Sequence, residues 1–161
     1  MDNLDRPLSL VDSQSYSPGA PDNVVARFEQ IAVERPDHPA LICGDEVINY
    51  AHLNAQANIL AHELIGQIGR GRAIVAILTG FGTQRWIAAL GVLKAGHAVV
   101  ILDPVYPEHH TLHILNECRA GVIVADQSTF ERATRFAQIA DCALILIDQA
   151  RDLSPKPNPC R

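Results

Sequence analysis

The sequence predicts an α/β fold of three layers, in which helices cover both faces of a mostly parallel sheet. Four short segments are almost continuously apolar, as strands buried on both faces are: residues 73–78, 98–102, 121–125 and 143–147. Segments with helical periodicity lie between them: residues 83–95, 107–118 and 128–139. Strands that alternate with helices indicate βαβ units, whose crossovers are expected to be right-handed.

Two more helices and a hairpin are predicted before these strands. Asp22-Asn23 is suited to cap a helix that runs to about Glu34, where the following prolines end it. Residues 40–43 and 46–50 flank the turn pair Gly44-Asp45, which is a hairpin signal. A second helix is expected over residues 51–65, ended by glycines at positions 66, 69 and 71.

The folded part is expected to span residues 23–148. Residues 1–22 show no sustained apolar period and contain three prolines, so they are predicted to be a disordered leader. Residues 149–161 are rich in proline and are predicted to form a tail.

Composition argues against several classes of function. The 161 residues carry a net charge of -5 and only 5% aromatic residues, which gives no electrostatic footprint for nucleic acid or an anionic membrane. No apolar run reaches the roughly 18 residues of a membrane span, and no secretory signal is evident. The cysteines at positions 43, 118, 142 and 160 form no CxxC pair. A cytoplasmic protein with reduced thiols is therefore expected.

The segment Leu93–Pro107 is the most informative for function. It begins in a predicted amphipathic helix over residues 86–95, expected to bury four apolar side chains: Trp86, Ala89, Leu90 and Leu93. Lys94 lies in the last turn, where a cation suits the helix dipole. Gly96 then fits the left-handed position that ends many helices.

The second half of this segment reads as a strand and its exit. Residues 99–102 are expected at the centre of the sheet. Asp103-Pro104 ends the strand, because proline donates no hydrogen bond to a ladder. Pro107 suits the start of the next helix, where its missing N–H is not needed.

These residues resemble a motif of the adenylate-forming (AMP-dependent synthetase/ligase) superfamily, and most closely the adenylation domains of nonribosomal peptide synthetases. The family's motif has the form L-K-A-G-x-A-Y-V-P-[LI]-D-P, followed closely by Y-P. The matching residues are Leu93, Lys94, Ala95, Gly96, Ala98, Val100, Leu102, Asp103, Pro104, Tyr106 and Pro107. Val99 and Ile101 depart from the usual Tyr and Pro.

A second motif of the family, L-T-Y-x-E-L, is matched upstream by Ile48-Asn49-Tyr50-Ala51-His52-Leu53. The following residues 54–61 resemble N-A-x-A-N-x-L-A, and the opening Phe28-Glu29-Gln30 also fits. The resemblance covers residues 23–148 in collinear order. It implies the first part of the large N-terminal subdomain of an adenylation domain.

The resemblance also implies ATP-dependent activation of a carboxylate. The family supplies the chemistry from a Ser/Thr/Gly-rich phosphate loop, later acidic residues and a lysine of a C-terminal domain, none of which this sequence contains. The motifs present shape the subdomain, so no catalytic, cofactor-binding or metal-binding residue is expected in this chain. ATP and Mg²⁺ belong to the complete family enzyme.

We therefore expect a truncated or split adenylation domain, inactive alone, whose partner is the missing remainder or a carrier-protein module. The competing interpretation is a non-enzymatic remnant or docking module.

A dinucleotide-binding site is a weaker alternative. Gly80-Phe81-Gly82 follows a strand and opens a helix, and Asp103 ends the next strand, much as in a Rossmann fingerprint. Arg85 replaces the third glycine, and its bulk opposes close helix–strand packing. A plain loop is the preferred interpretation.

Three other candidates are also read as structural. His109 and His113 share a helix face at a spacing that suits zinc, but no third ligand is evident. Lys94 lies at the wrong end of a helix dipole to bind an anion. Cys118 has no base nearby to activate it as a nucleophile.

Overall fold

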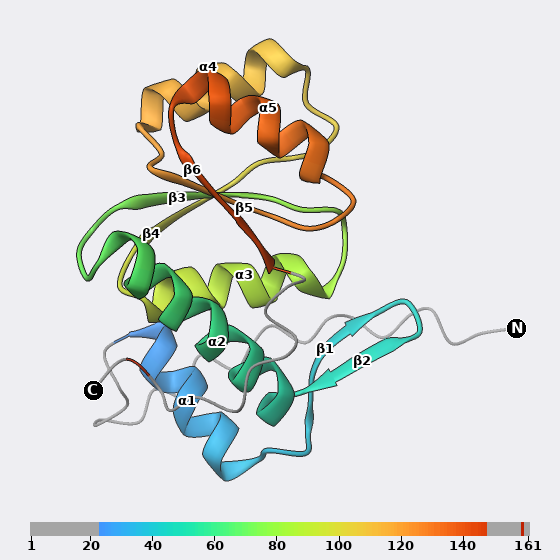
Figure 1. Cartoon of the computed structure of the whole chain (residues 1–161). Helices are drawn as coiled ribbons and strands as arrows, with labels where there is room; N and C mark the ends of the chain where they lie inside the picture. Colours follow the sequence, from blue (N-terminus) through green and yellow to red (C-terminus); the bar gives the residue numbers. More distant parts are fainter. Residues whose placement is uncertain (1–22, 148–158, 160–161) are drawn as a thin grey trace, which may run out of the picture.

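The computed structural model describes residues 23–147 and Pro159 (Figure 1). The elements in chain order are α1 (Val24–Glu34), β1 (Pro39–Cys43), β2 (Glu46–Asn49), α2 (Tyr50–Ile68), β3 (Ile74–Leu78), α3 (Thr83–Lys94), β4 (Ala98–Ile101), α4 (Glu108–Cys118), β5 (Val122–Ala125), α5 (Phe130–Ala140) and β6 (Ala143–Leu146).

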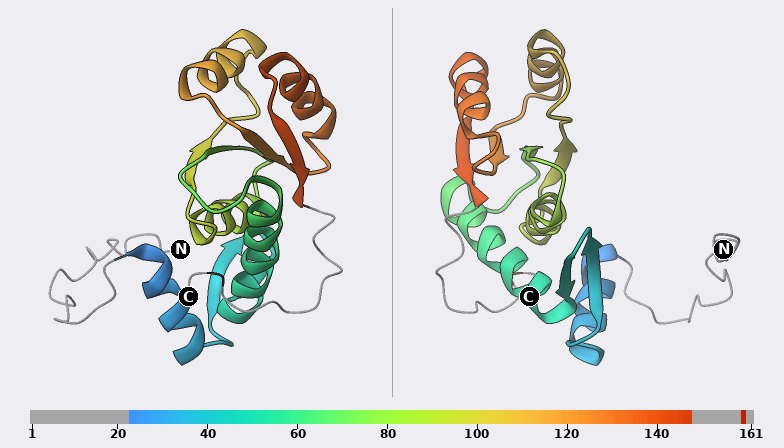
Figure 2. Two further views of the ribbon diagram at one scale, coloured as in Figure 1. Left: turned by 60° about the vertical axis from the view of Figure 1, so that its left-hand side comes forward. Right: turned by 90° about the vertical axis from the view of Figure 1, so that its right-hand side faces the viewer.

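Four strands form one parallel sheet in the order β4-β3-β5-β6. Helices α4 and α5 cover one face of this sheet, and α2 and α3 cover the other (Figure 1). The antiparallel hairpin of β1 and β2 and the helix α1 lie farther from the sheet, beyond α2 and α3 (Figure 2). The three-layer α/β prediction is confirmed.

Each face of the sheet has its own hydrophobic core. In β3, Val75 and Ile77 contribute to the core beneath α2 and α3, whereas Ala76 and Leu78 contribute to the core beneath α4 and α5. This alternation follows from the two-residue period of a strand. All four side chains are fully buried, which explains why the strands read as continuous apolar runs.

Asparagine side chains cap the first two helices. Asn23 accepts a hydrogen bond from the Ala26 N–H at 2.8 Å, and Asn49 accepts one from the His52 N–H at 2.8 Å. Each cap satisfies a backbone donor that the helix itself leaves free. Helix α2 continues through Gly66 to Ile68 and ends at Gly69, one turn later than predicted, where φ is 75°.

Two predictions about the segment Leu93–Pro107 and its helix are wrong. Residues 99–102 were expected at the centre of the sheet, but β4 lies at an edge of the four described strands. Trp86 was expected to be buried and is 55% exposed, while Ile87 and Val92 are buried. The buried stripe of α3 is thus rotated by about one residue, because α3 packs against both the sheet and α2.

The remaining boundaries differ by one or two residues. Helix α4 begins at Glu108, so Pro107 occupies the N-cap position just before the helix rather than its first turn. Helix α5 begins at Phe130 rather than Ser128. The predicted leader and tail lie outside the described residues, apart from Pro159. None of the helices formed by the described residues has the length and apolar character that crossing a membrane requires.

Candidate functional site

Lys94 is a buried cation that joins α3 to α1. Its side chain has no exposed surface, and its Nζ donates a hydrogen bond to Glu29 Oε1 of α1. The Glu29 side chain is 18% exposed. Lys94 Nζ also lies 5.8 Å from the centre of the Phe28 ring, within the range of a cation–π interaction. The carboxylate and the ring together offset the cost of removing the ammonium from water.

The two family-like motifs meet at Phe28. The Phe28 ring lies 5.6 Å from the ring of Tyr50, which begins α2 and belongs to the upstream motif. Three positions after Tyr50, Leu53 is 5% exposed and packs in the core beneath α2 and α3. Helix α1 therefore connects Tyr50 with Lys94, the motif residue of α3.

Gly96 stops α3 through a Schellman motif. The His97 N–H donates to the Val92 carbonyl at 3.1 Å, and the Gly96 N–H donates to the Leu93 carbonyl at 3.0 Å. Gly96 has φ of 83°, as predicted, a conformation that glycine adopts without strain. Ala95 is buried, and the Ala98 N–H then donates to the Ala73 carbonyl at 2.9 Å to start β4.

The chain leaves β4 in a tight turn that is stabilised by hydrogen bonds within the turn and by hydrogen bonds from α5. Asp103 Oδ1 accepts from the Val105 N–H at 2.8 Å, and the Asp103 carbonyl accepts from the Tyr106 N–H at 3.1 Å. Arg132 of α5 donates to the carbonyls of Pro104 and Tyr106. The Asp103 carboxylate is thus used by its own turn, and Pro107 follows as the cap of α4.

A buried aspartate organises the loops at the carboxyl ends of β3 and β5. Asp126 Oδ2 accepts from the Gly80 N–H at 2.7 Å. Asp126 Oδ1 accepts from Ser128 Oγ at 2.6 Å and from the Thr129 N–H at 3.1 Å. Burial raises the pKa of Asp126, but these hydrogen bonds outweigh burial and leave the pKa below its usual value. The residue is therefore an ionised acceptor at neutral pH.

This arrangement does not suit a dinucleotide pyrophosphate. The Gly80 N–H, which would face a phosphate in a Rossmann loop, already donates to Asp126. Thr83 Oγ1 in the first turn of α3 donates to Glu46 at 3.0 Å. Arg85 donates to the Thr79 carbonyl and stacks on the exposed Phe81 ring, 4.6 Å from its centre. The Gly80 N–H and the Thr83 hydroxyl are thus already bonded to carboxylates, and the Arg85 guanidinium to a backbone carbonyl.

Two carboxylates lie in the loops that follow β4 and β5. Asp103 and Asp126 bring negative charge to the loops after β4 and β5, and both carboxylates accept hydrogen bonds from neighbouring backbone N–H groups. Lys94 lies at the other end of α3 and is paired with Glu29.

The histidine and cysteine candidates do not assemble into a site among the described residues. His109 and His113 are exposed on α4, and the described residues contain no group of three or more His, Cys, Asp or Glu side chains suited to a metal. Cys118 Sγ lies 3.6 Å from the Leu115 carbonyl. Burial raises the pKa of the nearby Cys142 thiol, as do Asp141 and Cys118, so Cys142 stays protonated at neutral pH.

Three residues that hold this arrangement together escaped the sequence reasoning: Asp126, Thr129 and Arg132. Glu29 was noted only in the opening Phe28-Glu29-Gln30, and its pairing with Lys94 was not predicted. Asp126 had a usable signal, because it directly follows a buried strand and precedes Ser128 and Thr129, whose hydroxyl groups can bond to it. The contacts of Glu29 and Arg132 had no such signal, because each pairs with residues far away in the sequence.

The parallel sheet, its two helical layers and the folded segment Leu93–Pro107 define an α/β subdomain of the adenylate-forming class. The chain belongs to the AMP-binding enzyme family, whose sequence model matches residues 28–158. Because this match includes both motifs in order, it confirms the family that the motifs indicated.

The relatives that match by sequence include synthetases much longer than this chain. The chain is 40% identical over 99 residues to malpinin synthetase of Mortierella alpina, a match that covers 62% of this chain and 1% of the relative. It is also 40% identical over 99 residues to bacitracin synthase 1 of Bacillus licheniformis, covering 61% of this chain and 2% of the relative. The chain thus spans only a small share of these proteins.

The fold is shared with a solved nonribosomal peptide synthetase, FmoA3 bound to α-methyl-L-serine-AMP. The TM-score is 0.73 at 20% identity, and the match covers 83% of this chain and 15% of that one. At this identity the likeness establishes the fold alone.

Proposed function

We propose that residues 23–148 form the first part of the large subdomain of an adenylation domain, which activates a carboxylic acid as an acyl adenylate in nonribosomal peptide or related acyl metabolism in the cytoplasm. The match of the family over residues 28–158 carries this proposal. In it, the motif residues Tyr50, Lys94, Gly96 and Asp103 build the scaffold.

The chemistry of adenylation is assigned to the remainder of such a domain. Transfer to the α-phosphate of ATP requires donors that cradle the phosphates, Mg²⁺ and a cation at the developing charge. Among the described residues, the Gly80 N–H and the Thr83 hydroxyl donate to carboxylates of the chain itself, those of Asp126 and Glu46. We therefore expect this chain alone to form no acyl adenylate.

Pyrophosphate exchange with amino and aryl acids tests this proposal. The isolated chain should show no exchange above the blank. A chimera should restore it, if this chain replaces the aligned stretch of the bacitracin synthase 1 adenylation domain and the amino acid of the host is supplied. Robust exchange by the isolated chain would contradict the expected inactivity. A folded but inactive chimera would contradict the scaffold role.

The chimera needs a matched control with a defective scaffold. Gly96→Val serves, because a β-branched residue is strained at φ of 83°. This variant should lose exchange together with its folded circular-dichroism signal, which would show that the assay responds to the scaffold.

A docking module that pairs with a separate remainder is the second candidate. Exposed apolar side chains follow three neighbouring strands at one edge of the sheet, namely Phe81 after β3, Val105 after β4 and Phe130 after β5. Such a patch is typical of a surface that another part covers. Restored exchange on mixing this chain with a host domain that lacks the stretch would favour this candidate, and absence of binding would exclude it.

A further inference from the structure

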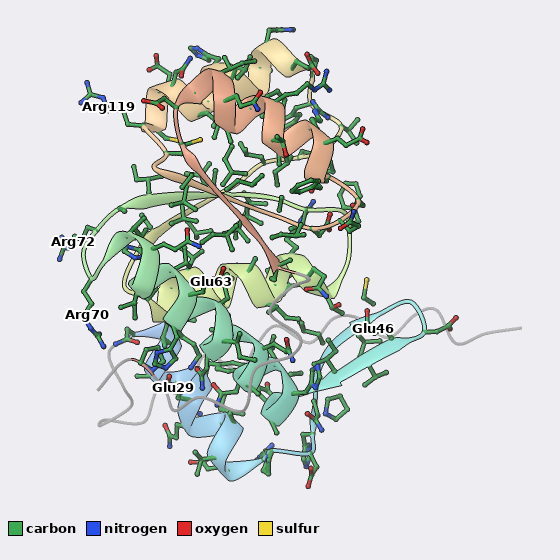
Figure 3. The ribbon with its side chains drawn as sticks, in the orientation of Figure 1. Glu29, Glu46, Glu63, Arg70, Arg72 and Arg119 are labelled. Carbon is green, nitrogen blue, oxygen red and sulfur yellow. The ribbon has the colours of Figure 1, made fainter. Side chains whose placement is uncertain are left out.

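A cavity of about 380 Å³ lies between the hairpin, the first two turns of α2 and the start of α3. Each of these three elements contributes two side chains to its lining, namely Glu46 and Ile48 of β2, His52 and Gln56 of α2, and Gln84 and Ile87 of α3. Figure 3 shows Glu46 on the hairpin, on the side that faces the start of α3. The cavity therefore exists only where the hairpin docks on the two helices.

Glu46 is the one acidic side chain among the residues that line this cavity, and its carboxylate is held in place. Thr83, which also lines the cavity, donates from Oγ1 to Glu46 Oε2 at 3.0 Å. Thr83 is 3% exposed, so the packing of α3 fixes the hydroxyl that orients the carboxylate. No hydrogen bond from the described residues reaches Glu46 Oε1. The carboxylate can thus accept from a further donor.

Neutral acceptors surround this carboxylate. Gln56 and Gln84 are half-buried, and His52 lies four positions before Gln56 on the same face of α2. The side chains of these three residues form no hydrogen bond or ion pair with the described residues. Carboxamide oxygens and an imidazole nitrogen accept hydrogen bonds. Several acceptors without a partner in the described part of the chain therefore line one cavity.

The cavity also has an apolar wall. Ile48 is 7% exposed and Ile87 is 3% exposed, and both belong to the hydrophobic core beneath α2 and α3. Their positions are fixed by this core, so an apolar group that enters the cavity meets a rigid surface. An apolar wall with a few polar groups, in a volume of about 300–1,000 Å³, is typical of sites for small molecules.

We infer that this cavity binds a small organic cation, whose primary ammonium donates to Glu46 and whose short apolar body packs on Ile48 and Ile87. An ammonium carries three donors and no acceptor, so it matches a carboxylate with amide oxygens around it. An anion does not fit, because no lysine or arginine is among the residues that line the cavity. This inference is independent of the proposed function, since it concerns binding and none of its consequences involves catalysis.

The n-butylammonium ion tests the inference in the full chain at pH 7, and 1-butanol is the matched probe with the same apolar body and no charge. Titration followed by two-dimensional ¹H–¹⁵N NMR should give saturable shifts for the backbone amides of Thr83 and Gln84 and for the side-chain amide of Gln56. Binding of 1-butanol should be about fivefold weaker, because it lacks the attraction to the carboxylate. Equal affinity for the two probes, or shifts only at amides away from the cavity, would overturn the inference.

The variant Glu46→Gln should weaken the binding of n-butylammonium about fivefold. Its side chain keeps an oxygen that can accept from Thr83, so the hairpin should stay docked, and far-UV circular dichroism checks the fold. Asp45→Asn is the matched control, because it removes the neighbouring carboxylate of the hairpin turn, which does not line the cavity. It should leave the affinity unchanged. An unchanged affinity in Glu46→Gln would overturn the inference, as would the absence of saturable shifts in the wild type.

Discussion

Lys94 carries a charge with no exposed side-chain surface, so its contribution to stability depends on Glu29. Lys94→Met keeps the length of the side chain but leaves the Glu29 carboxylate mostly buried and without the ammonium. We expect a loss of about 3 kcal/mol in the free energy of unfolding, as is typical when one partner of a buried pair is removed. Urea unfolding at pH 7 measures this loss.

The double variant Glu29→Gln/Lys94→Met separates the ion pair from packing. It removes both charges and should recover at least half of the loss, since no buried charge is then left without its counterion. Arg72→Met is the matched control at an exposed cation and should change stability by less than about 0.5 kcal/mol. A double variant less stable than Lys94→Met would show that the charges matter for another reason.

Asp126 makes the free energy of unfolding depend on pH. Its hydrogen bonds keep the pKa of the folded state below the ordinary value despite burial, so the folded state binds fewer protons than the unfolded state as the pH falls. The contribution is complete at neutral pH and is lost as the pH falls below about 4.

Asp126→Asn should therefore lower stability at pH 7 by about 1–2 kcal/mol, and the difference from the wild type should shrink by pH 3. Urea unfolding at the two pH values measures both effects. Asp45→Asn, at the exposed turn of the hairpin, should show neither. An equal difference at both pH values would contradict the role assigned to the ionised carboxylate.

At the level of elements, Gly91 sets how closely α3 approaches α2. A Cβ at Gly91 would lie 2.9 Å from Leu60 Cδ2 and 3.1 Å from the Ala57 carbonyl oxygen. Gly91→Ala should therefore destabilise the protein by about 1–3 kcal/mol through overpacking, although alanine is the better helix former. The free energy of unfolding in urea measures the change.

Gly66 is the matched control for this prediction. It lies inside α2, and a Cβ there would meet nothing within 4 Å. Gly66→Ala should stabilise the protein by about 0.5–1 kcal/mol, the usual gain in helix propensity. Gly91→Ala as stable as Gly66→Ala would refute the close approach of the two helices.

The elements show where sequence reasoning succeeds and where it stops. Local patterns located every described helix and strand, because apolar periods, asparagine caps and Gly96 act within a few residues. They misplaced β4, because the order of strands in a sheet depends on contacts between distant segments. They also predicted that Trp86 is buried, whereas Ile87 is the buried residue. Apolar residues occur on two sides of α3, and only the packing against α2 determines which side is buried.

The candidate site was harder to predict than the fold for the same reason. The motif residues were identified from their spacing, but the partner of Lys94 comes from a helix 65 positions earlier. The turn after Asp103 is held by Arg132, which lies in α5. No local pattern encodes such pairs.

At the level of the whole molecule, the apolar side chains at the carboxyl edge of the sheet should govern association. Phe81 is 71% exposed and Val105 is 76% exposed, and the loops that carry them follow the adjacent strands β3 and β4. The full chain should therefore bind an apolar dye and self-associate at micromolar concentration, because exposed apolar patches favour contacts that remove them from water.

The variant Phe81→Ser/Val105→Ser should lower dye fluorescence at least twofold and shift the chain toward the monomer in analytical ultracentrifugation. Val33→Ser/Ile139→Ser is the matched control, since these residues are 79% and 65% exposed but lie on α1 and α5, apart from each other. Isolated apolar residues are common on protein surfaces and should not drive association.

Equal effects of the two double variants would show that total apolar exposure, rather than this edge of the sheet, determines association. A dye-silent monomeric wild type would mean that the edge needs no cover, which would count against both a missing remainder and a docking partner.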